Sequence, residues 1–172
     1  MNGPPAPIVV APAQPTDVAG ILSVLDASAD DSWVFRRRAA DVGRAIADFA
    51  VARDPHGRVV GCAALHWSTP TLAELLSVAV LPHLRNRQVG TRLVQYQQRR
   101  AHERGARQTW LMTRTPDYFE RHGYRPAPHT VVPIRVLGAK LASVFAQPPT
   151  RWIPAMAGQE TTMVRTASSQ DS

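Results

Sequence analysis

The sequence has very little cysteine and no long apolar run. Cys62 is the single cysteine among 172 residues, which excludes an internal disulfide and is typical of a reducing cytoplasm. No stretch of about 18 apolar residues occurs, so no membrane-spanning helix is expected. The first residues, MNGPPAPIVVAPAQP, lack a basic start and are interrupted by prolines, which argues against a secretory signal. Together these absences predict a cytoplasmic protein.

Lysine is also scarce, because Lys140 is the only one and arginine carries nearly all of the positive charge. The formal net charge is +7. Such an arginine-rich surface could meet a polyanionic cofactor or an acidic partner, or it could be an ordinary solvated helix face. No nucleic-acid motif accompanies it, so nucleic acid is not the expected partner. Seven arginines lie in one segment opposed only by Glu103: Arg85, Arg87, Arg92, Arg99, Arg100, Arg104 and Arg107.

Hydrophobic periodicity and turn residues predict a single mixed α/β domain over residues 15–166, with flexible tails over 1–14 and 167–172. The order of elements predicts an antiparallel meander that becomes parallel across a central helix. The expected elements are helices over 18–27 and 36–49, a hairpin over 50–67, a strand over 75–80, a helix over 90–104, a strand over 109–113, a short helix over 116–121, an extended segment over 131–134, a helix over 136–146 and a closing strand over 161–166.

The stretch over residues 72–94, LAELLSVAVLPHLRNRQVGTRLV, is the most informative part of the chain. Its strand ends before Pro82, and an arginine-bearing turn over residues 85–90 leads into a helix. A strand, a turn and a helix in this order direct amide N–H groups and the positive end of a helix dipole toward an anion. The stretch therefore predicts a site for a phosphate-bearing ligand.

With these residues the chain resembles the GNAT family of acetyl-coenzyme A (acetyl-CoA) dependent N-acetyltransferases, best over residues 61–124. The family signature, Arg or Gln followed by x-x-Gly-x-Gly/Ala, falls on Arg85, Gln88 and Gly90. The resemblance implies an α/β fold with a mixed central sheet flanked by helices, and acetyl-CoA as co-substrate. Amides of the turn would hold the pyrophosphate, and main-chain groups of the preceding strand would bind the pantetheine arm. The implied cofactor-binding residues are Val78, Ala79, Val80, Arg85, Asn86, Arg87, Gln88, Val89, Gly90 and Thr91.

The signature departs from the family pattern at two positions. Asn86 and Gln88 stand where glycines are usual, so they keep the amides and add bulk. Gly90 follows the pattern, and its missing Cβ is expected to let the phosphate approach closely.

A narrower resemblance is to the amino-acid N-acetyltransferase group, which includes N-acetylglutamate synthase. It rests on the segments GCAALH, AELLSVAV, LMTR and YFERHGY. That group often carries a basic residue two places after the glutamate of the key strand, where this chain has Leu76. The expected acceptor is therefore an amino acid or another small amine, with glutamate itself in doubt.

The implied reaction needs a general base and a group that reprotonates the leaving thiolate. Glu74 is the expected base, because it lies four residues before Val78 on the strand that should hold the coenzyme. The family's usual general-acid slot falls on Phe119, which has no hydroxyl, and Tyr118 stands one place earlier as the candidate acid. Backbone N–H of Val78 or Val80 would polarise the thioester carbonyl.

Two further residues are candidates for binding the acceptor. His66 ends the strand beside the key strand, and Arg114 follows the fifth strand and could bind a carboxylate. Cys62 has no partner motif and is expected to be a small core residue. No metal is expected, since no histidines and cysteines have ligand spacing.

Three functions remain open from the sequence. The leading one is transfer of an acetyl group to a small amine, such as an amino acid. A second keeps the cofactor and takes a protein or drug amine, and a third is a non-catalytic acyl-CoA-binding regulatory module. A homodimer is compatible with each of them.

Overall fold

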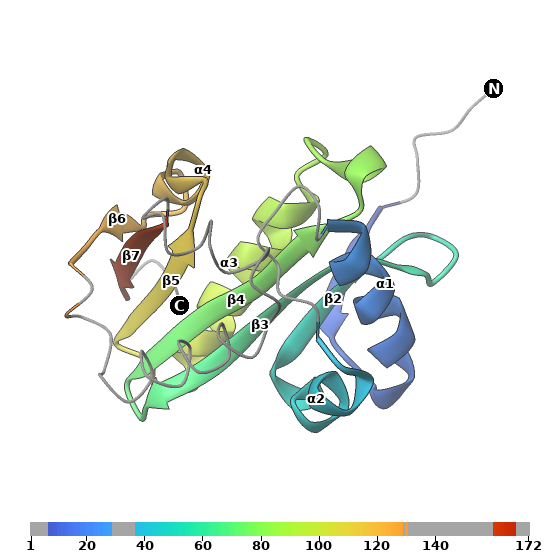
Figure 1. The fold of residues 1–172 in the computed structure, drawn as a ribbon, viewed down its shortest axis with the longest axis horizontal. Coiled ribbons are helices and arrows are strands. Elements are labelled where there is room, and N and C mark those ends of the chain that lie inside the picture. Colours follow the sequence, from blue (N-terminus) through green and yellow to red (C-terminus); the bar gives the residue numbers. More distant parts are fainter. Residues whose placement is uncertain (1–6, 29–36, 129, 131–159, 168–172) are drawn as a thin grey trace, which may run out of the picture.

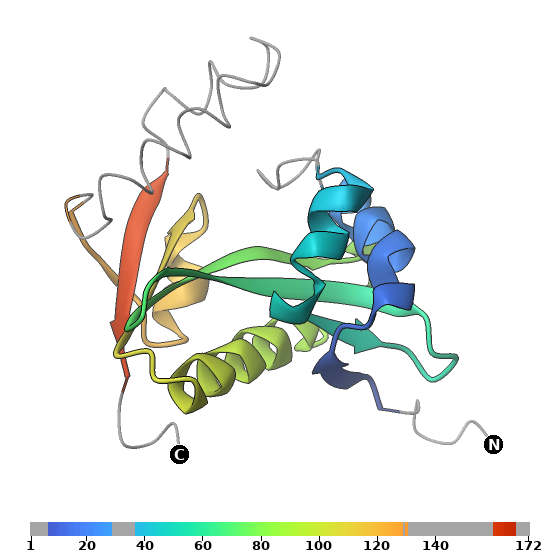
Figure 2. The ribbon, with the colours of Figure 1, turned by 90° about the horizontal axis from the view of Figure 1, so that it is seen from below.

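The computed structural model describes residues 7–28, 37–128, 130 and 160–167, and these build one mixed sheet with helices on both faces (Figures 1 and 2). Its strand order is β1-β2-β3-β4-β5-β7-β6. The elements along the chain are β1 (Val9–Pro12), η1 (Pro15–Asp17), α1 (Val18–Ser28), α2 (Ala39–Arg44), η2 (Ile46–Asp48), β2 (Phe49–Arg53), β3 (Val59–Thr69), β4 (Leu72–Val80), η3 (Pro82–Leu84), α3 (Val89–Glu103), β5 (Gln108–Thr113), α4 (Pro116–Glu120), β6 (Arg125–Pro126) and β7 (Thr161–Thr166).

Only one pair of neighbouring strands in the described sheet is parallel. β1 to β4 are antiparallel neighbours, β4 and β5 are parallel, and β7 pairs antiparallel with both β5 and β6. The parallel step needs a crossover, which α3 supplies on the face opposite α1 and α2 (Figure 2). This confirms the predicted meander that becomes parallel across the central helix.

Alternating side chains of the strands feed a separate core on each face of the sheet. Cys62, Ala64 and Ala79 pack with Ile21 and Leu25 of α1 on one face. On the other face, the alternate residues of the same strands pack against Leu93 and Val94 of α3, which are fully buried. These strand residues are Ala63, Leu65, Ala73 and Leu75. The strands over 59–80 are thus covered on both faces, which explains their nearly continuous apolar sequence.

Most of the predicted elements are confirmed, including the first helix, the hairpin, the key strand and the closing strand at Thr161–Thr166. The second helix was predicted too long, because Phe49 already belongs to β2 and is buried against α1. Val9–Pro12 forms an edge strand along β2, so the prediction of a flexible tail over 1–14 is wrong for these four residues. The elements predicted over 131–134 and 136–146 lie outside the described residues.

Three arginines of the basic segment hold neighbouring backbone or stack on a ring instead of facing a partner. Arg92 donates to the Ile8 carbonyl at 3.1 Å, and Arg100 donates to the Ala47 carbonyl. Arg104 pairs with Asp48 at 3.3 Å and lies 5.0 Å over the Trp67 ring. Arg85, Arg87, Arg99 and Arg107 are exposed. Part of the arginine face is therefore structural and binds α3 to its surroundings.

A bidentate ion pair anchors the start of α1 to the sheet. The two Asp17 carboxylate oxygens accept hydrogen bonds from the Arg53 guanidinium, each at 2.6 Å, and one also accepts the Gln14 amide at 2.7 Å. The hydrogen bond from Arg53 is the main cause that lowers the pKa of Asp17 below its ordinary value, 3.8, against the opposing effect of burial. The carboxylate thus contributes stability above pH 3.8 that is lost as the pH falls through its lower folded pKa.

Replacing Asp17 with Asn is expected to lower the free energy of unfolding by about 2 kcal/mol at pH 7, because Arg53 then loses its charged partner. The difference from wild type should shrink as the pH falls below 3.8. Urea denaturation at pH 7 and at low pH measures both. Arg44→Gln removes the exposed pair with Asp41 and should change stability by less than about 0.5 kcal/mol. A constant difference at all pH values would contradict this account of Asp17.

Candidate functional site

The turn between β4 and α3 adopts a backbone conformation that normally favours glycine. Asn86 has φ 63° and Gln88 has φ 60°, so two side-chain-bearing residues are left-handed. Each costs about 1 kcal/mol relative to glycine. Gln88 is also the N-cap residue of α3 and makes no side-chain cap bond. The turn thus has, at Asn86 and Gln88, the left-handed backbone that glycine favours, although both positions carry side chains.

The amides from Asn86 to Thr91 lie in this turn and in the first turn of α3. Among the described residues, no backbone-to-backbone hydrogen bond is donated by an amide from Asn86 to Thr91. The first amides of a helix have no carbonyl partner within it, and the 15 residues of α3 add a helix dipole behind them. Such a cluster of N–H groups can bind a phosphate.

The pairing of β4 with β5 stops after three residues. Leu72, Ala73 and Glu74 pair with Gln108, Thr109 and Trp110, and the rest of β4 pairs only with β3 among the described strands. Figure 1 shows the two strands running apart beyond this point. The edge of β4 from residue 75 onward, which would face β5, is thus left without a strand partner in the described part of the chain.

A bulge in β4 lies within this unpaired stretch. Cys62 pairs with Ala79 and Ala64 pairs with Leu76, so β4 has one residue more than β3 between these pairs. Ser77 takes up the extra length with φ 54°. The Cys62 thiol donates to the Ser77 carbonyl at 3.5 Å, and burial raises the pKa of this thiol to about 12. Cys62 is therefore a protonated core residue beside the bulge and is no nucleophile.

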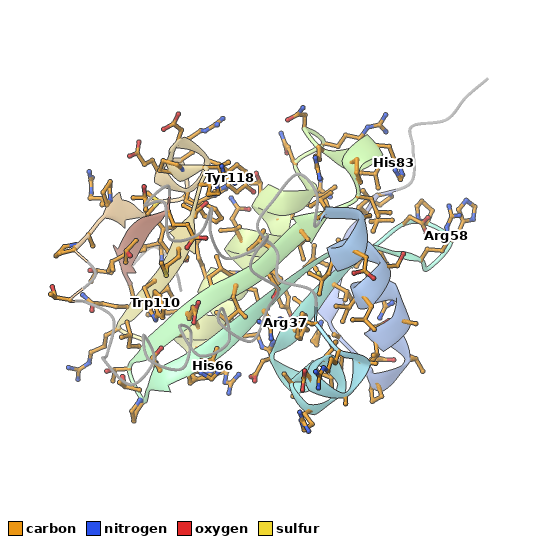
Figure 3. All side chains as sticks on the ribbon, in the orientation of Figure 1. Arg37, Arg58, His66, His83, Trp110 and Tyr118 are labelled. Atoms are coloured by element: carbon orange, nitrogen blue, oxygen red, sulfur yellow. The ribbon has the colours of Figure 1, made fainter. Side chains whose placement is uncertain are left out.

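Glu74 faces the side of the sheet that carries α1 and α2. It is only 4% exposed and lies opposite His66, which is itself exposed. The Arg37 guanidinium lies close enough to be attracted by Glu74 and Asp41. Burial lowers the pKa of Arg37, and these two carboxylates raise it in part. Figure 3 labels Arg37 beside α2 and His66 near the end of β3.

Arg37 is the residue that sequence reasoning missed. It lies just before α2, in a run of three arginines in which no periodicity distinguishes one from the others. Its half-buried position near Glu74 follows from the packing of α2 against the sheet. That packing cannot be predicted from the residues next to Arg37.

Tyr118 brings its hydroxyl to the start of α3. A Cβ placed on Gly90 would lie 2.7 Å from this hydroxyl, so the glycine makes room for the tyrosine (Figure 3 labels Tyr118). The hydroxyl is enclosed without a well-formed hydrogen bond to the described residues. Burial raises the pKa of Tyr118, and Thr91 lowers it in part. Phe119 instead packs in the core against Tyr124, with ring centroids 5.9 Å apart.

The two residues predicted to bind the acceptor do not lie together. Arg114 is exposed beyond the carboxyl end of β5, whereas His66 is level with Glu74 and Trp110. Four residues of extended chain separate Arg114 from Trp110, a distance of about 13 Å. His66 is therefore near Glu74, and Arg114 is nearer the far end of β4.

The described residues contain no group of three or more histidines, cysteines and carboxylates that could hold a metal ion. In the same part of the chain, no helix is long and apolar enough to cross a membrane.

The chain is similar to known acetyltransferases. Residues 45–126 match the family model of the acetyltransferase (GNAT) domain. An uncharacterized N-acetyltransferase from Chlorobaculum tepidum is 32% identical over 122 residues, which cover 71% of this chain and 78% of the relative. An amino-acid acetyltransferase from Mycobacterium tuberculosis is 29% identical over 130 residues, or 74% of each chain.

Two solved structures share the fold. A Mycobacterium tuberculosis protein in complex with CoA superposes with a TM-score of 0.78 at 24% identity, covering 93% of this chain and 99% of that one. N-acetylglutamate synthase from Neisseria gonorrhoeae, complexed with coenzyme A and N-acetyl-glutamate, gives 0.70 at 19% identity, covering 96% of this chain and 36% of that one.

Gly90→Ala is expected to lower the free energy of unfolding by about 1–3 kcal/mol, because the new methyl group meets the Tyr118 hydroxyl. Adding Tyr118→Phe removes that hydroxyl and should recover most of the loss. Gly43→Ala is the matched control, since nothing lies within 4 Å of its Cβ position, and it should be neutral or stabilising. Thermal and urea unfolding of the four variants measures this. Equal loss in the single and double variants would contradict the contact.

Proposed function

This chain belongs to the GNAT family and is an acetyl-CoA-dependent N-acetyltransferase, and we propose that its acceptor is the α-amine of a free amino acid. The observation that carries the choice of acceptor is the pair of opposite charges formed by Glu74 and Arg37 on one face of the sheet. A free amino acid carries the same two charges, an ammonium group and a carboxylate. The relatives named amino-acid acetyltransferase support the same substrate class.

Acetyl-CoA would bind where the described residues leave backbone groups available. The amides of residues 86–91 suit the pyrophosphate, because none of them donates a backbone hydrogen bond within the described part of the chain. The unpaired edge of β4 offers main-chain groups to the amide-bearing pantetheine arm, as an added strand would. Arg85 and Arg87 are exposed at the same turn and add positive charge.

Residues near the divergence of β4 and β5 would supply the groups that the transfer requires. Glu74 accepts a proton from the ammonium group, directly or through water, and the free amine nitrogen attacks the thioester carbonyl carbon. The Val78 amide, next to the bulge, donates to the carbonyl oxygen as negative charge develops there. The carbon–sulfur bond then breaks, and the acylated nitrogen loses its second proton to water. The thiolate takes a proton that Tyr118 can donate, and the phenolate then regains a proton from water. The raised pKa of Tyr118 keeps its proton in place at neutral pH.

The acceptor would be oriented from both ends. Its amine lies toward Glu74, and its carboxylate toward the Arg37 guanidinium, which can form two parallel hydrogen bonds to it. Arg37 thereby takes the role of the basic residue that the strand lacks at Leu76. His66 lies across from Glu74 and can contact the acceptor's side chain. Arg114 is more distant and suits a second carboxylate only if the acceptor is long.

Thiol release from acetyl-CoA, measured over a panel of amino acids, amines and peptides, tests the acceptor. Turnover with free α-amino acids above all other amines is the expected result. Preference for a protein or drug amine would move the assignment to that class. Acetyl-CoA binding without turnover on any amine would favour a regulatory acyl-CoA-binding module.

Glu74→Gln is expected to lower kcat by about 10²-fold on the best acceptor, because the base is lost while the shape is kept. The loss should shrink at high pH, where more of the amine is already deprotonated. Glu103→Gln, an exposed residue of α3, is the control and should leave kcat unchanged. An unchanged kcat in Glu74→Gln would exclude Glu74 as the base.

Arg37→Met is expected to raise the KM for the amino acid about ten-fold or more, because a charge-assisted carboxylate contact is lost. The KM for acetyl-CoA should stay the same. Arg38→Met removes an exposed arginine next to it and serves as the matched control. The amide of the same amino acid, which has no carboxylate, should be used equally by wild type and Arg37→Met. Equal effects on acid and amide would contradict the carboxylate contact.

A further inference from the structure

Two consecutive glutamines of α3 bind backbone carbonyls on opposite sides of the divergence between β4 and β5. Gln97 is fully buried and Gln98 is 8% exposed, which is unusual for a polar side chain in a helix. Their neighbours one turn earlier, Leu93 and Val94, are apolar and fully buried. The two amide groups therefore lie inside an apolar layer, where each bond they make has a fixed geometry.

Gln97 binds β3 and η2, which lie on the β4 side of the divergence. Its Nε2 donates to the Ala63 carbonyl at 2.8 Å and to the Asp48 carbonyl at 3.1 Å. Ala63 is the β3 residue opposite the bulge, since it lies between the pairs formed by Cys62 and Ala64. The Oε1 of the same side chain is enclosed without a partner among the described residues. An apolar residue would avoid that cost, so the two donated bonds are what the glutamine contributes.

Gln98 binds the side that carries β5 and α4. Its Nε2 donates to the His122 carbonyl at 2.9 Å, two residues beyond the end of α4. The His122 ring packs against the Tyr118 ring with centroids 5.0 Å apart. Consecutive helix positions differ by about 100°, which lets the two side chains reach in different directions from one helix.

We propose that Gln97 and Gln98 are positioning residues that set the separation between the β4 bulge and α4, and so the spacing from the Val78 amide to the Tyr118 hydroxyl. Apolar contacts alone would allow α3 to slide against the strands, whereas two directional bonds fix its place relative to each side. The consequence for catalysis rests on the proposed function. The consequence for local structure does not.

Hydrogen–deuterium exchange of the protein without ligand tests the structural part. Gln97→Met, which loses two hydrogen bonds, should speed exchange in a peptide covering residues 75–80 by about ten-fold or more. Gln98→Met, which loses one, should speed exchange in a peptide covering 116–122 by about ten-fold. Exchange in α1, on the other face of the sheet, should not change. Gln95→Met, at an exposed position of the same helix, is the matched control. Gln97→Asn and Gln98→Asn shorten the side chain and keep the amide group. They are measured instead wherever the methionine variant does not fold.

Steady-state kinetics well below the unfolding temperature tests the catalytic part. Each variant should lower kcat about ten-fold with a smaller change in the KM for the amino acid, because the acceptor's charged contacts at Arg37 and Glu74 are untouched. A residue needed only for stability would lower the unfolding temperature and leave kcat unchanged. Unchanged local exchange, or exchange that rises equally over the whole chain, would overturn the proposal. Failure of the wild type to turn over any amine would count against the proposed function alone, because the exchange result stands separately.

Discussion

The short parallel ladder between β4 and β5 is the constraint on which the rest of the structure depends. Three residue pairs hold the strands together, and the bulge at Ser77 then gives β4 a length that no longer matches β3. A continuous ladder would have used the backbone groups of β4 in strand pairing. Because it stops, a polar edge survives in the middle of a sheet that is apolar on both faces, next to the first amides of α3.

Keeping such an edge open requires the surrounding elements to be held firmly. α1 is tied to β2 through Asp17 and Arg53, and α3 is tied to its surroundings through Arg92, Arg100 and Arg104. α4 rests on Gly90, where only the absence of a side chain lets Tyr118 approach. These contacts are directional and fix α1, α3 and α4 to neighbouring elements. They leave the two strands apart while the cores on each face supply most of the stability.

The sequence was sufficient for those features that depend on neighbouring residues. The hairpin, the strand at Leu72–Val80 and the turn into α3 follow from local turn chemistry and periodicity. Contacts between distant segments were not accessible in this way. Nothing near Arg37 in the sequence indicates that Glu74 attracts it, and nothing near Gly90 indicates that the Tyr118 hydroxyl lies where a Cβ at that position would stand. Phe49 was assigned to a helix because helical spacing alone does not show which core a residue joins.

The enclosure of Cys62 bears on the surroundings in which this protein can persist. A thiol with a pKa of about 12 and no exposed surface is neither a thiolate nor open to peroxide or to another protein's disulfide. Since the chain has no other cysteine, its folded form offers oxidants no reactive sulfur from this residue type. A low cysteine count alone would suggest dependence on reducing conditions. The buried position means instead that Cys62 does not make the fold depend on the redox state around it.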